Sequence, residues 1–503
     1  MKKVFVFFQL IPMCTWLNAQ TEGDVFFGSP MVHTVKFTFP YSNYIDSLTW
    51  SYTNDTYIKG NVEVDGITYV DCGIKWKGNS SYSVPGIKKS FKIDFNEFVS
   101  GQDLDGLKKL NLNNCFKDPS FLREKLMLDF LIEHSQPAPR CTYTEVYINT
   151  TLWGLYTGVE EIDKTFLNRW FNDKKGNLFK GDPTGDLKWL GSTPSTYYSK
   201  YELKTNNTAN DWTDLVHLLD IINNTPSATY QTTLDGFFDT PNYVYTWATH
   251  LLFANLDSYL GSGHNYYIYH DSTANKMRFI SWDVNEAFGE FNMGMSIPSL
   301  ENLPVTYIPT PSSNRPLHQN MLANGYTQPL YDAVCDLINL DFSIWKMEWK
   351  IDSLADVVRP FVYADPNKFY SNANFESNIT NDVTLGGMPG GTFPGIKSFI
   401  INRRNDISAD LSAHSCVVGL QEATNNQTVQ LYPNPVVNNL YLNGVTENST
   451  FSIFDISGKL VYTTILKSNN PTIDVSFLTQ GIYLTNVKNT KFGTNMNNRL
   501  IKN

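Results

Sequence analysis

Alternating apolar and polar residues predict that the first part of the chain is rich in β-strands. Residues 35–39 (Val-Lys-Phe-Thr-Phe) and 91–95 (Phe-Lys-Ile-Asp-Phe) carry an apolar side chain at every second position. This period of two is typical of strands with one buried face. Asp65 and Gly66 lie between two such runs and predict a hairpin turn. Further strands are expected at 145–149, 153–160 and 201–204.

Helical periodicity is more frequent in the later part of the chain. A helix is expected to begin with Asp118 as its N-cap and Pro119 at its first position, and to end before Pro137. Further helices are expected at 212–223 and 243–255, and residues 330–412 are mainly helical in pattern. Because strands come early and helices late, the sequence indicates an α+β body.

The two ends of the chain differ from this body. Two lysines, a mostly apolar stretch at 4–17 and Ala19 predict a secretory signal peptide over residues 1–19, which leaves a body at 20–412. A polar linker is expected at 413–428. Short alternating runs with turns over 429–503 then predict a small all-β sandwich. No later run of about 18 apolar residues occurs, so no transmembrane helix is expected.

Composition and charge narrow the function. Hydrophobic residues make up 42% of the 503 residues, which is enough for a large core. The net charge of -10 argues against nucleic-acid binding and fits a divalent cation or a basic partner better. The absence of any CxxC motif excludes a zinc knuckle. One or two disulfides and buried free thiols are both compatible with the five cysteines beyond the signal peptide, at 72, 115, 141, 335 and 416.

Polar residues that could do chemistry gather around a predicted hairpin at 265–283. Its strands are expected at 266–269 and 278–282, with a turn at 272–275. Asn265 and Asp283 are symmetric about a turn centre near 274, so we expect them to face each other at the open end. Asp257 is expected at the same end, on the glycine-rich loop that precedes the hairpin.

Two carboxylates and an amide oxygen form an oxygen-rich site that suits Mg²⁺ or Mn²⁺. Phosphoryl transfer uses such a site to hold metal ions and to position an acceptor hydroxyl. Three other interpretations remain open. Asn265 and Asp283 could simply cap the hairpin, Asp257 and Asp283 could be the two carboxylates of a glycosidase, and the same oxygens could bind calcium in an adhesin.

The sequence resembles the CotH family, named for spore coat protein H, whose members are kinase-like. The likeness runs in order from about residue 24 to residue 412. It includes the Trp282-Asp283 pair and the glycine-rich loop after Asp257. The segments that carry it are 73–81, 88–92, 118–126, 137–140, 153–163, 176–181, 202–206, 257–271 and 282–289.

The resemblance implies an atypical protein-kinase-like fold with a β-rich N-lobe and a helical C-lobe, which uses ATP and Mg²⁺ or Mn²⁺. Asp257 matches the position of the catalytic base, and Asp283 and Asn265 match the metal-binding positions. Trp282 matches an aromatic residue that stacks on adenine, and Tyr156 is the candidate for the other face.

The resemblance also requires a cation near the phosphates of ATP. Lys92 and Lys180 are the main candidates, beside Lys77, Lys89 and Arg123. It leaves open which residue pairs with Glu160 or Glu161. His264 is expected to orient the loop that carries Asn265, and Ser80 and Ser81 either cover the phosphates or form an ordinary turn.

The last residues resemble the C-terminal sorting domain of the type IX secretion system. The resemblance rests on the Tyr-Pro-Asn-Pro motif at 432–435 and on the segments 454–462 and 478–483. It implies that the type IX secretion machinery is a partner and that the protein reaches the cell surface or the medium. A carbohydrate-binding sandwich is the other interpretation of this region.

Together these features predict a secreted or surface kinase. It would move the γ-phosphate of ATP to serine or threonine of an extracellular or surface protein, its own chain among the candidates. The alternative is a catalytically silent surface-binding protein with the same fold.

Overall fold

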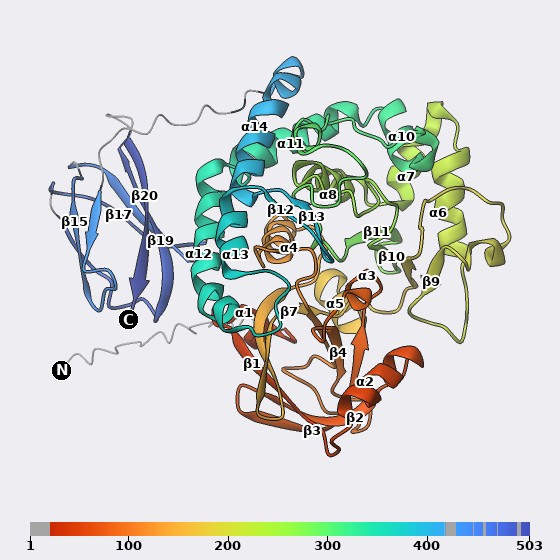
Figure 1. Cartoon of the computed structure of the whole chain (residues 1–503). Helices are drawn as coiled ribbons and strands as arrows, with labels where there is room; N and C mark the ends of the chain where they lie inside the picture. Colours follow the sequence, from red (N-terminus) through yellow and green to blue (C-terminus); the bar gives the residue numbers. More distant parts are fainter. Residues whose placement is uncertain are drawn as a thin grey trace, which may run out of the picture.

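A computed structural model describes residues 21–416, 418, 429–445, 447–455, 459–469, 471–489 and 494–503 (Figure 1). The predicted order of a β-rich part followed by a helical part is confirmed. The predicted signal peptide at 1–19 and most of the predicted linker at 413–428 lie outside the described residues.

A closed β-barrel forms the first part of the protein. Its strands follow the order β1-β2-β3-β4-β5-β7-β6, and they are antiparallel except where β1 meets β6. Two short helices, α2 (Tyr44–Thr53) and α3 (Ser80–Ser83), lie outside it. The strands are β1 (His33–Thr38), β2 (Ile58–Val64), β3 (Ile67–Lys77), β4 (Ser90–Asp94), β5 (Lys109–Asn113), β6 (Cys141–Ile148) and β7 (Thr151–Glu160).

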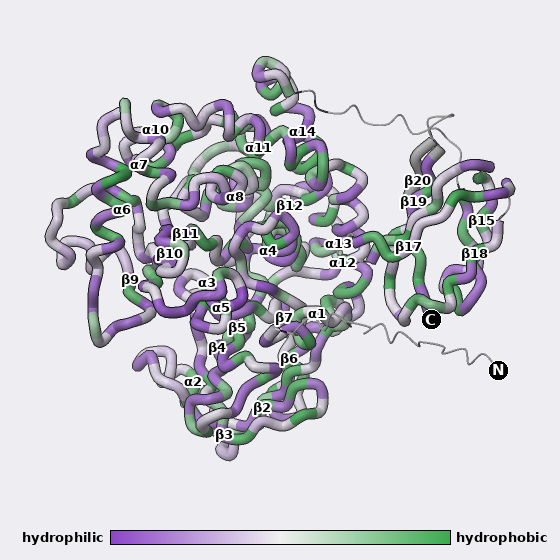
Figure 2. Tube along the Cα trace, turned by 180° about the vertical axis from the view of Figure 1, so that it is seen from behind, coloured by the Kyte–Doolittle hydropathy of each residue, from purple (hydrophilic) through white to green (hydrophobic). Residues whose placement is uncertain are grey.

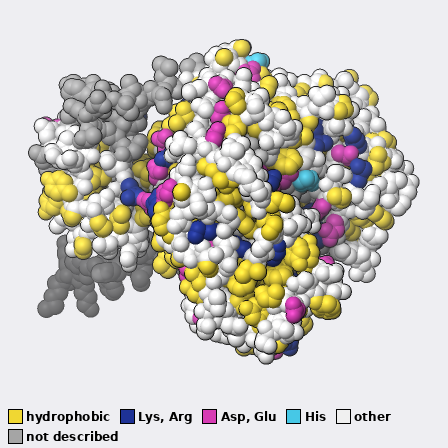
Figure 3. Space-filling view, in the orientation of Figure 1, with side chains coloured by type: hydrophobic (Ala, Val, Ile, Leu, Met, Phe, Trp, Pro, Cys, Tyr) yellow, Lys and Arg dark blue, Asp and Glu magenta, His cyan; other side chains and the backbone are white. Residues whose placement is uncertain are grey.

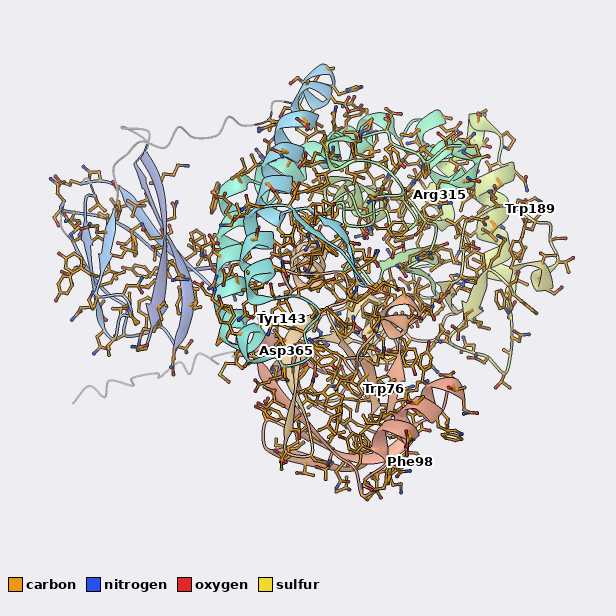
Figure 4. The ribbon with its side chains drawn as sticks, in the orientation of Figure 1. Trp76, Phe98, Tyr143, Trp189, Arg315 and Asp365 are labelled. Carbon is orange, nitrogen blue, oxygen red and sulfur yellow. A yellow bond between two sulfur atoms is a disulfide. The ribbon has the colours of Figure 1, made fainter. Side chains whose placement is uncertain are left out.

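Alternation along these strands separates a core face from a polar face. Trp76 and Phe91 are buried in the barrel core, and Figure 4 labels Trp76 among the strands. Their neighbours Lys77 and Lys92 point the other way, because successive side chains of a strand face opposite sides. The register pairs Lys92 with Asn111 of β5. The barrel therefore presents a row of polar side chains outside its core.

The second part is mainly helical and contains a four-stranded sheet in the order β11-β10-β8-β9. Helix α8 (Thr240–Leu252) runs through its middle (Figures 1 and 2), and most of its side chains are buried. The sheet strands are β8 (Leu178–Gly181), β9 (Tyr201–Leu203), β10 (Tyr266–Asp271) and β11 (Lys276–Ser281). The larger helices are α4 (Arg123–Glu133), α5 (Lys164–Phe171), α6 (Thr213–Asn224), α7 (Tyr230–Phe237), α10 (Pro316–Ala323), α11 (Thr327–Leu340), α12 (Ile344–Ala364), α13 (Asn372–Thr380) and α14 (Ile396–Ala413).

The predicted start of α4 at Asp118 is wrong, because the helix begins at Arg123. Phe121 has a φ of 60°, a left-handed conformation that an α-helix excludes. Asp118 instead accepts hydrogen bonds from the backbone nitrogens of Ser120 at 3.0 Å and Arg123 at 2.9 Å. It also pairs with the buried Arg123 guanidinium at 2.8 Å. Asp118 therefore closes a turn before the helix and binds the backbone nitrogen of the first helical residue from outside the helix.

A buried ion pair joins the barrel to the helical part. Lys88 Nζ lies 2.5 Å from Asp365 Oδ2 at the end of α12, and both side chains are almost completely inaccessible. The same carboxylate accepts a hydrogen bond from the Leu155 nitrogen of β7 at 3.0 Å. Gly154 allows this approach, since a Cβ atom there would lie 2.4 Å from Asp365 Oδ1. Figure 4 labels Asp365 beside the barrel strands.

A disulfide fastens the end of the helical part. It joins Cys335 of α11 to Cys416, which follows α14. The sequence left open whether the cysteines form disulfides or remain free thiols, and this pair forms a disulfide. The other cysteines of the described chain, Cys72, Cys115 and Cys141, are buried free thiols.

The C-terminal region is all β, as predicted, and forms two sheets around one apolar core that includes Leu440, Phe451 and Leu500. The sheets lie beside α12 (Figure 1), where Asp356 pairs with Arg499. One sheet contains β14 (Gln430–Tyr432), β15 (Asn439–Asn443) and β18 (Thr472–Asp474). The other contains β16 (Thr450–Phe454), β17 (Leu460–Ile465), β19 (Gly481–Asn489) and β20 (Thr494–Lys502).

We predict that Asp365→Asn lowers the free energy of unfolding by about 3–5 kcal/mol, because it leaves the Lys88 ammonium buried without a counter-charge. Urea denaturation measures the loss. Asp71→Asn is the matched control, since its partner Lys59 is half exposed and such pairs contribute about 0–1 kcal/mol. Equal losses in the two variants would show that the buried pair does not hold the two parts together.

Candidate functional site

The predicted residues Asp257, Asn265 and Asp283 lie at the open end of the β10–β11 hairpin. There, Figure 3 shows acidic, basic and histidine side chains around a hollow between the barrel and the helical part. The register pairs Tyr266 with Ser281 and Asp271 with Lys276. Asn265 therefore lies opposite Trp282, whose nitrogen donates to the Asn265 carbonyl at 3.2 Å. The prediction that Asn265 faces Asp283 directly is wrong by one residue, because the turn centre falls between residues 273 and 274.

Two left-handed residues redirect the chain at this end of the hairpin. Asn265 has a φ of 59° and Asp283 a φ of 52°. The chain therefore turns away from the direction of β11 directly after Trp282. The Asp283 side chain is only partly buried, and no hydrogen bond reaches its carboxylate from the described residues. Burial raises the pKa of Asp283, and the nearby charge of Asp257 raises it further, against the opposite effects of Lys77 and Lys180.

Asp257 is fixed by two neighbours on the loop that follows α8. His264 Nε2 lies 2.8 Å from Asp257 Oδ1. Asn265 Nδ2 donates to Asp257 Oδ2 and to the Asp257 carbonyl, both at 2.9 Å. The hydrogen bond and charge of Asp257 outweigh burial and raise the pKa of His264. Because the amide nitrogen of Asn265 is engaged, its oxygen is the atom left for a ligand.

The barrel contributes a lysine that no carboxylate contacts directly. Lys77 Nζ donates to Asn111 Oδ1 at 3.1 Å and to Asn113 Oδ1 at 3.0 Å, and it lies 5.5 Å from the centre of a Trp282 ring. Burial lowers the pKa of Lys77 to about 8, although Asp283 and Glu161 oppose the shift. An ammonium held by two neutral amides keeps one donor for an anionic ligand.

Lys92 pairs with Glu161, which the sequence left open. The Lys92 Nζ to Glu161 Oε1 distance is 2.5 Å, and Asn111 Nδ2 donates to the other oxygen at 2.7 Å. These partners outweigh burial and lower the pKa of Glu161 to about 2. Glu160 instead binds Arg140 and Arg169, each at 2.7 Å. Asn111 therefore links Lys77 to the Lys92–Glu161 pair.

Two further predicted site residues, Lys180 and Trp282, lie on or directly after strands of the sheet in the helical part. Lys180 lies on β8 opposite Tyr267 and forms an ion pair with Asp182 at 2.5 Å. Trp282 is 9% exposed, and its role toward adenine stays a prediction.

The structure does not bring Tyr156 to the site. Its side chain is fully buried in the barrel core, 5.8 Å from the Phe91 ring centre. Strand alternation explains the error, because the inner face of β7 carries this ring. Lys89 and Arg123 also have other partners: Lys89 binds the carbonyls of Tyr82 and Val84, and Arg123 binds Asp118.

Sequence reasoning missed several buried polar residues next to the site. Glu124 accepts from Asn113 Nδ2 at 2.8 Å, and burial raises the pKa of Glu124 to about 8, with Asp283 contributing. Glu286 binds Lys117 at 2.9 Å, and burial together with Glu290 raises the pKa of Glu286 to about 9. The sequence did contain one signal for polar side chains on this side of the barrel. It is the run Asn-Leu-Asn at 111–113, whose amides occupy the outward positions of a strand.

Sequence comparison establishes the family of the protein. The family model described as CotH kinase protein matches residues 74–404, which is more than half of the chain. The chain belongs to the CotH kinase protein family. Inner spore coat protein H of Bacillus subtilis (strain 168) is a similar protein. It is 25% identical over 289 residues, which span 56% of this chain and 75% of that protein.

A second family model, the secretion system C-terminal sorting domain, matches residues 430–503 of this CotH-family protein. The match indicates secretion or surface display through the type IX system and contact with its machinery. None of the described helices is long and apolar enough to span a membrane.

One solved structure is also similar over a short part of the chain. It is PorZ, a surface component of the type IX secretion system of Porphyromonas gingivalis. It is 18% identical, with a TM-score of 0.15, over 17% of this chain and 13% of PorZ. A match this short and loose carries no argument about the fold.

Proposed function

We propose that this CotH-family protein is a metal-dependent kinase that transfers the γ-phosphate of ATP to a serine or threonine hydroxyl of a secreted or surface protein. The barrel and the helical part would be the two lobes of an atypical kinase. The observation that carries the proposal is the charge pattern of the hollow. The Lys77 ammonium, held by neutral amides, lies near the Asp283 carboxylate, which accepts no hydrogen bond from the described residues.

Asp283 and the side-chain oxygen of Asn265 would hold Mg²⁺ or Mn²⁺. No group of three or more His, Cys, Asp or Glu side chains in the described chain could hold a metal alone. Mg²⁺ commonly uses one or two carboxylates together with substrate phosphates, so the nucleotide would supply the other oxygen ligands. When bound, such an ion neutralises charge on the phosphate oxygens.

Asp257 would position the acceptor hydroxyl. Its carboxylate is already oriented by His264 and Asn265, so little freedom is lost when a substrate arrives. In the reaction, the bond between the γ-phosphorus and the oxygen of ADP breaks, and a bond to the acceptor oxygen forms. The acceptor proton moves to Asp257.

The barrel lysines would bind the phosphates. Lys77 has a free donor, and Lys92 is held in place by Glu161. Lys180 would add positive charge from the sheet of the helical part, since its charge already affects Asp283. Trp282 would contact adenine at the same end of the hairpin.

One observation favours the alternative of a silent surface-binding protein. The sorting domain indicates a location outside the cell, where free ATP is scarce. A protein of this kind would keep the fold and lose nucleotide binding. Thermal unfolding with ATP and Mg²⁺ separates the two candidates, because only a nucleotide-binding protein is stabilised by mass action.

We predict that the purified protein transfers radiolabelled γ-phosphate to itself or to a co-secreted protein when Mg²⁺ or Mn²⁺ is present. Asp283→Ala is expected to lower the rate by about a hundredfold or more, because charge stabilisation in the transition state is lost. Asp71→Ala, in an exposed ion pair of the barrel, is the matched control. Equal labelling by the wild type and Asp283→Ala would contradict the proposed site, and no labelling with any metal would contradict the proposed activity.

We also predict that ATP affinity falls by about tenfold between pH 7.5 and pH 9, because Lys77, with a pKa of about 8, loses its charge over this range. Lys77→Arg should bind ATP almost equally at both pH values, since a guanidinium stays protonated. Isothermal titration calorimetry measures both affinities, with Lys59→Arg as the control that keeps the pH dependence. The same pH dependence in Lys77→Arg would show that Lys77 does not contact the phosphates.

A further inference from the structure

A buried histidine lies behind the site and contacts the segments that carry its two carboxylates. His250 belongs to the last turn of α8 and is 4% exposed. Its two side-chain hydrogen bonds go to Ser281 and Asn255 and not to Asp257, Asn265 or Asp283, so the proposed chemistry leaves it without a direct role.

Each ring nitrogen of His250 has its own partner. Asn255 Nδ2 lies 3.2 Å from His250 Nδ1, and Ser281 Oγ lies 3.0 Å from His250 Nε2. A neutral imidazole has one donor and one acceptor nitrogen, so the ring can form both contacts at once. The Asn255 backbone nitrogen also donates to the His250 carbonyl at 2.9 Å.

Both partners stand two residues before a carboxylate of the site. Asn255 precedes Asp257, and Ser281 precedes Asp283. Ser281 also pairs across the hairpin with Tyr266, the neighbour of Asn265. One imidazole therefore joins the loop after α8 to the open end of the hairpin.

The surroundings keep this link intact. Asn255 and Ser281 are fully buried, so neither can replace its bond to His250 by one to bulk water. Burial lowers the pKa of His250 to about 4. The ring is therefore neutral at physiological pH and offers the one donor and one acceptor that the two contacts need.

We infer that His250 is a positioning residue that sets the distance between the Asp257 and Asp283 carboxylates by binding Asn255 and Ser281. The effect on phosphoryl transfer rests on the proposed function. The structural link does not, because it can be measured without turnover.

The test replaces His250 by phenylalanine, which keeps the ring volume and removes both hydrogen bonds. His33→Phe is the matched control. His33 is also buried and also uses both ring nitrogens, at 2.6 Å to Asp65 and 2.7 Å to the Phe26 carbonyl, but it lies in the barrel. Circular dichroism first establishes that both variants are folded.

Backbone hydrogen exchange measures whether His250 holds the two segments in place. His250→Phe should increase exchange in both 253–260 and 281–287, while His33→Phe should change neither. Ser281→Ala removes one contact and should affect mainly 281–287. The inference is overturned if His250→Phe leaves either segment as protected as in the wild type. It is also overturned if His33→Phe has the same effect.

Steady-state kinetics measure the effect on phosphoryl transfer at the site. His250→Phe should lower kcat about a hundredfold with little change in the KM for ATP, since small misplacement of reacting groups has effects of this size. Adding Ser281→Ala to His250→Phe should lower kcat no further. An unchanged kcat in folded His250→Phe would overturn the positioning role. If the wild type transfers no phosphate, the proposed function fails, and hydrogen exchange alone decides the inference.

Discussion

The position of the candidate site depends on the buried ion pair between Lys88 and Asp365. Separating a buried ammonium from its buried carboxylate leaves both charges without a partner and is strongly unfavourable. The barrel and α12 therefore stay together at this contact. Lys88 lies on the segment between β3 and β4, which carry Lys77 and Lys92. Fixing this segment also fixes where these two lysines face the hairpin end of the helical part.

The charges across the hollow are arranged unevenly. Lys92 and Glu161 balance each other, whereas Lys77 binds neutral amides and Asp283 accepts no hydrogen bond from the described residues. Charged groups in a partly buried site are normally paired, so the arrangement favours a ligand with both anionic groups and a cation. A nucleotide with a divalent metal supplies both. His250 would then maintain the distance between the carboxylates on which such a ligand depends.

Local patterns predicted the elements well and the contacts between them less well. Alternation correctly placed strands around Lys92 and Tyr156, but it could not tell which face of β7 looks into the barrel, so it gave no check on Tyr156, which the family resemblance had offered for the site. The hairpin was predicted, yet its register was shifted by one, because it depends on where a four-residue turn is centred. Pairings such as Lys88–Asp365 join residues 277 positions apart, a separation over which local periodicity carries no information.

A crystal structure of the protein with Mn²⁺ and a non-hydrolysable ATP analogue, with anomalous scattering to locate the metal, tests most directly whether the hairpin end binds a metal and a nucleotide. If Asp283 and Asn265 hold the metal, a manganese peak is expected within bonding distance, about 2.2 Å, of both the Asp283 carboxylate and the Asn265 side-chain oxygen, with the phosphates on Lys77. A nucleotide bound elsewhere, or a metal that contacts neither Asn265 nor Asp283, would contradict the proposed site.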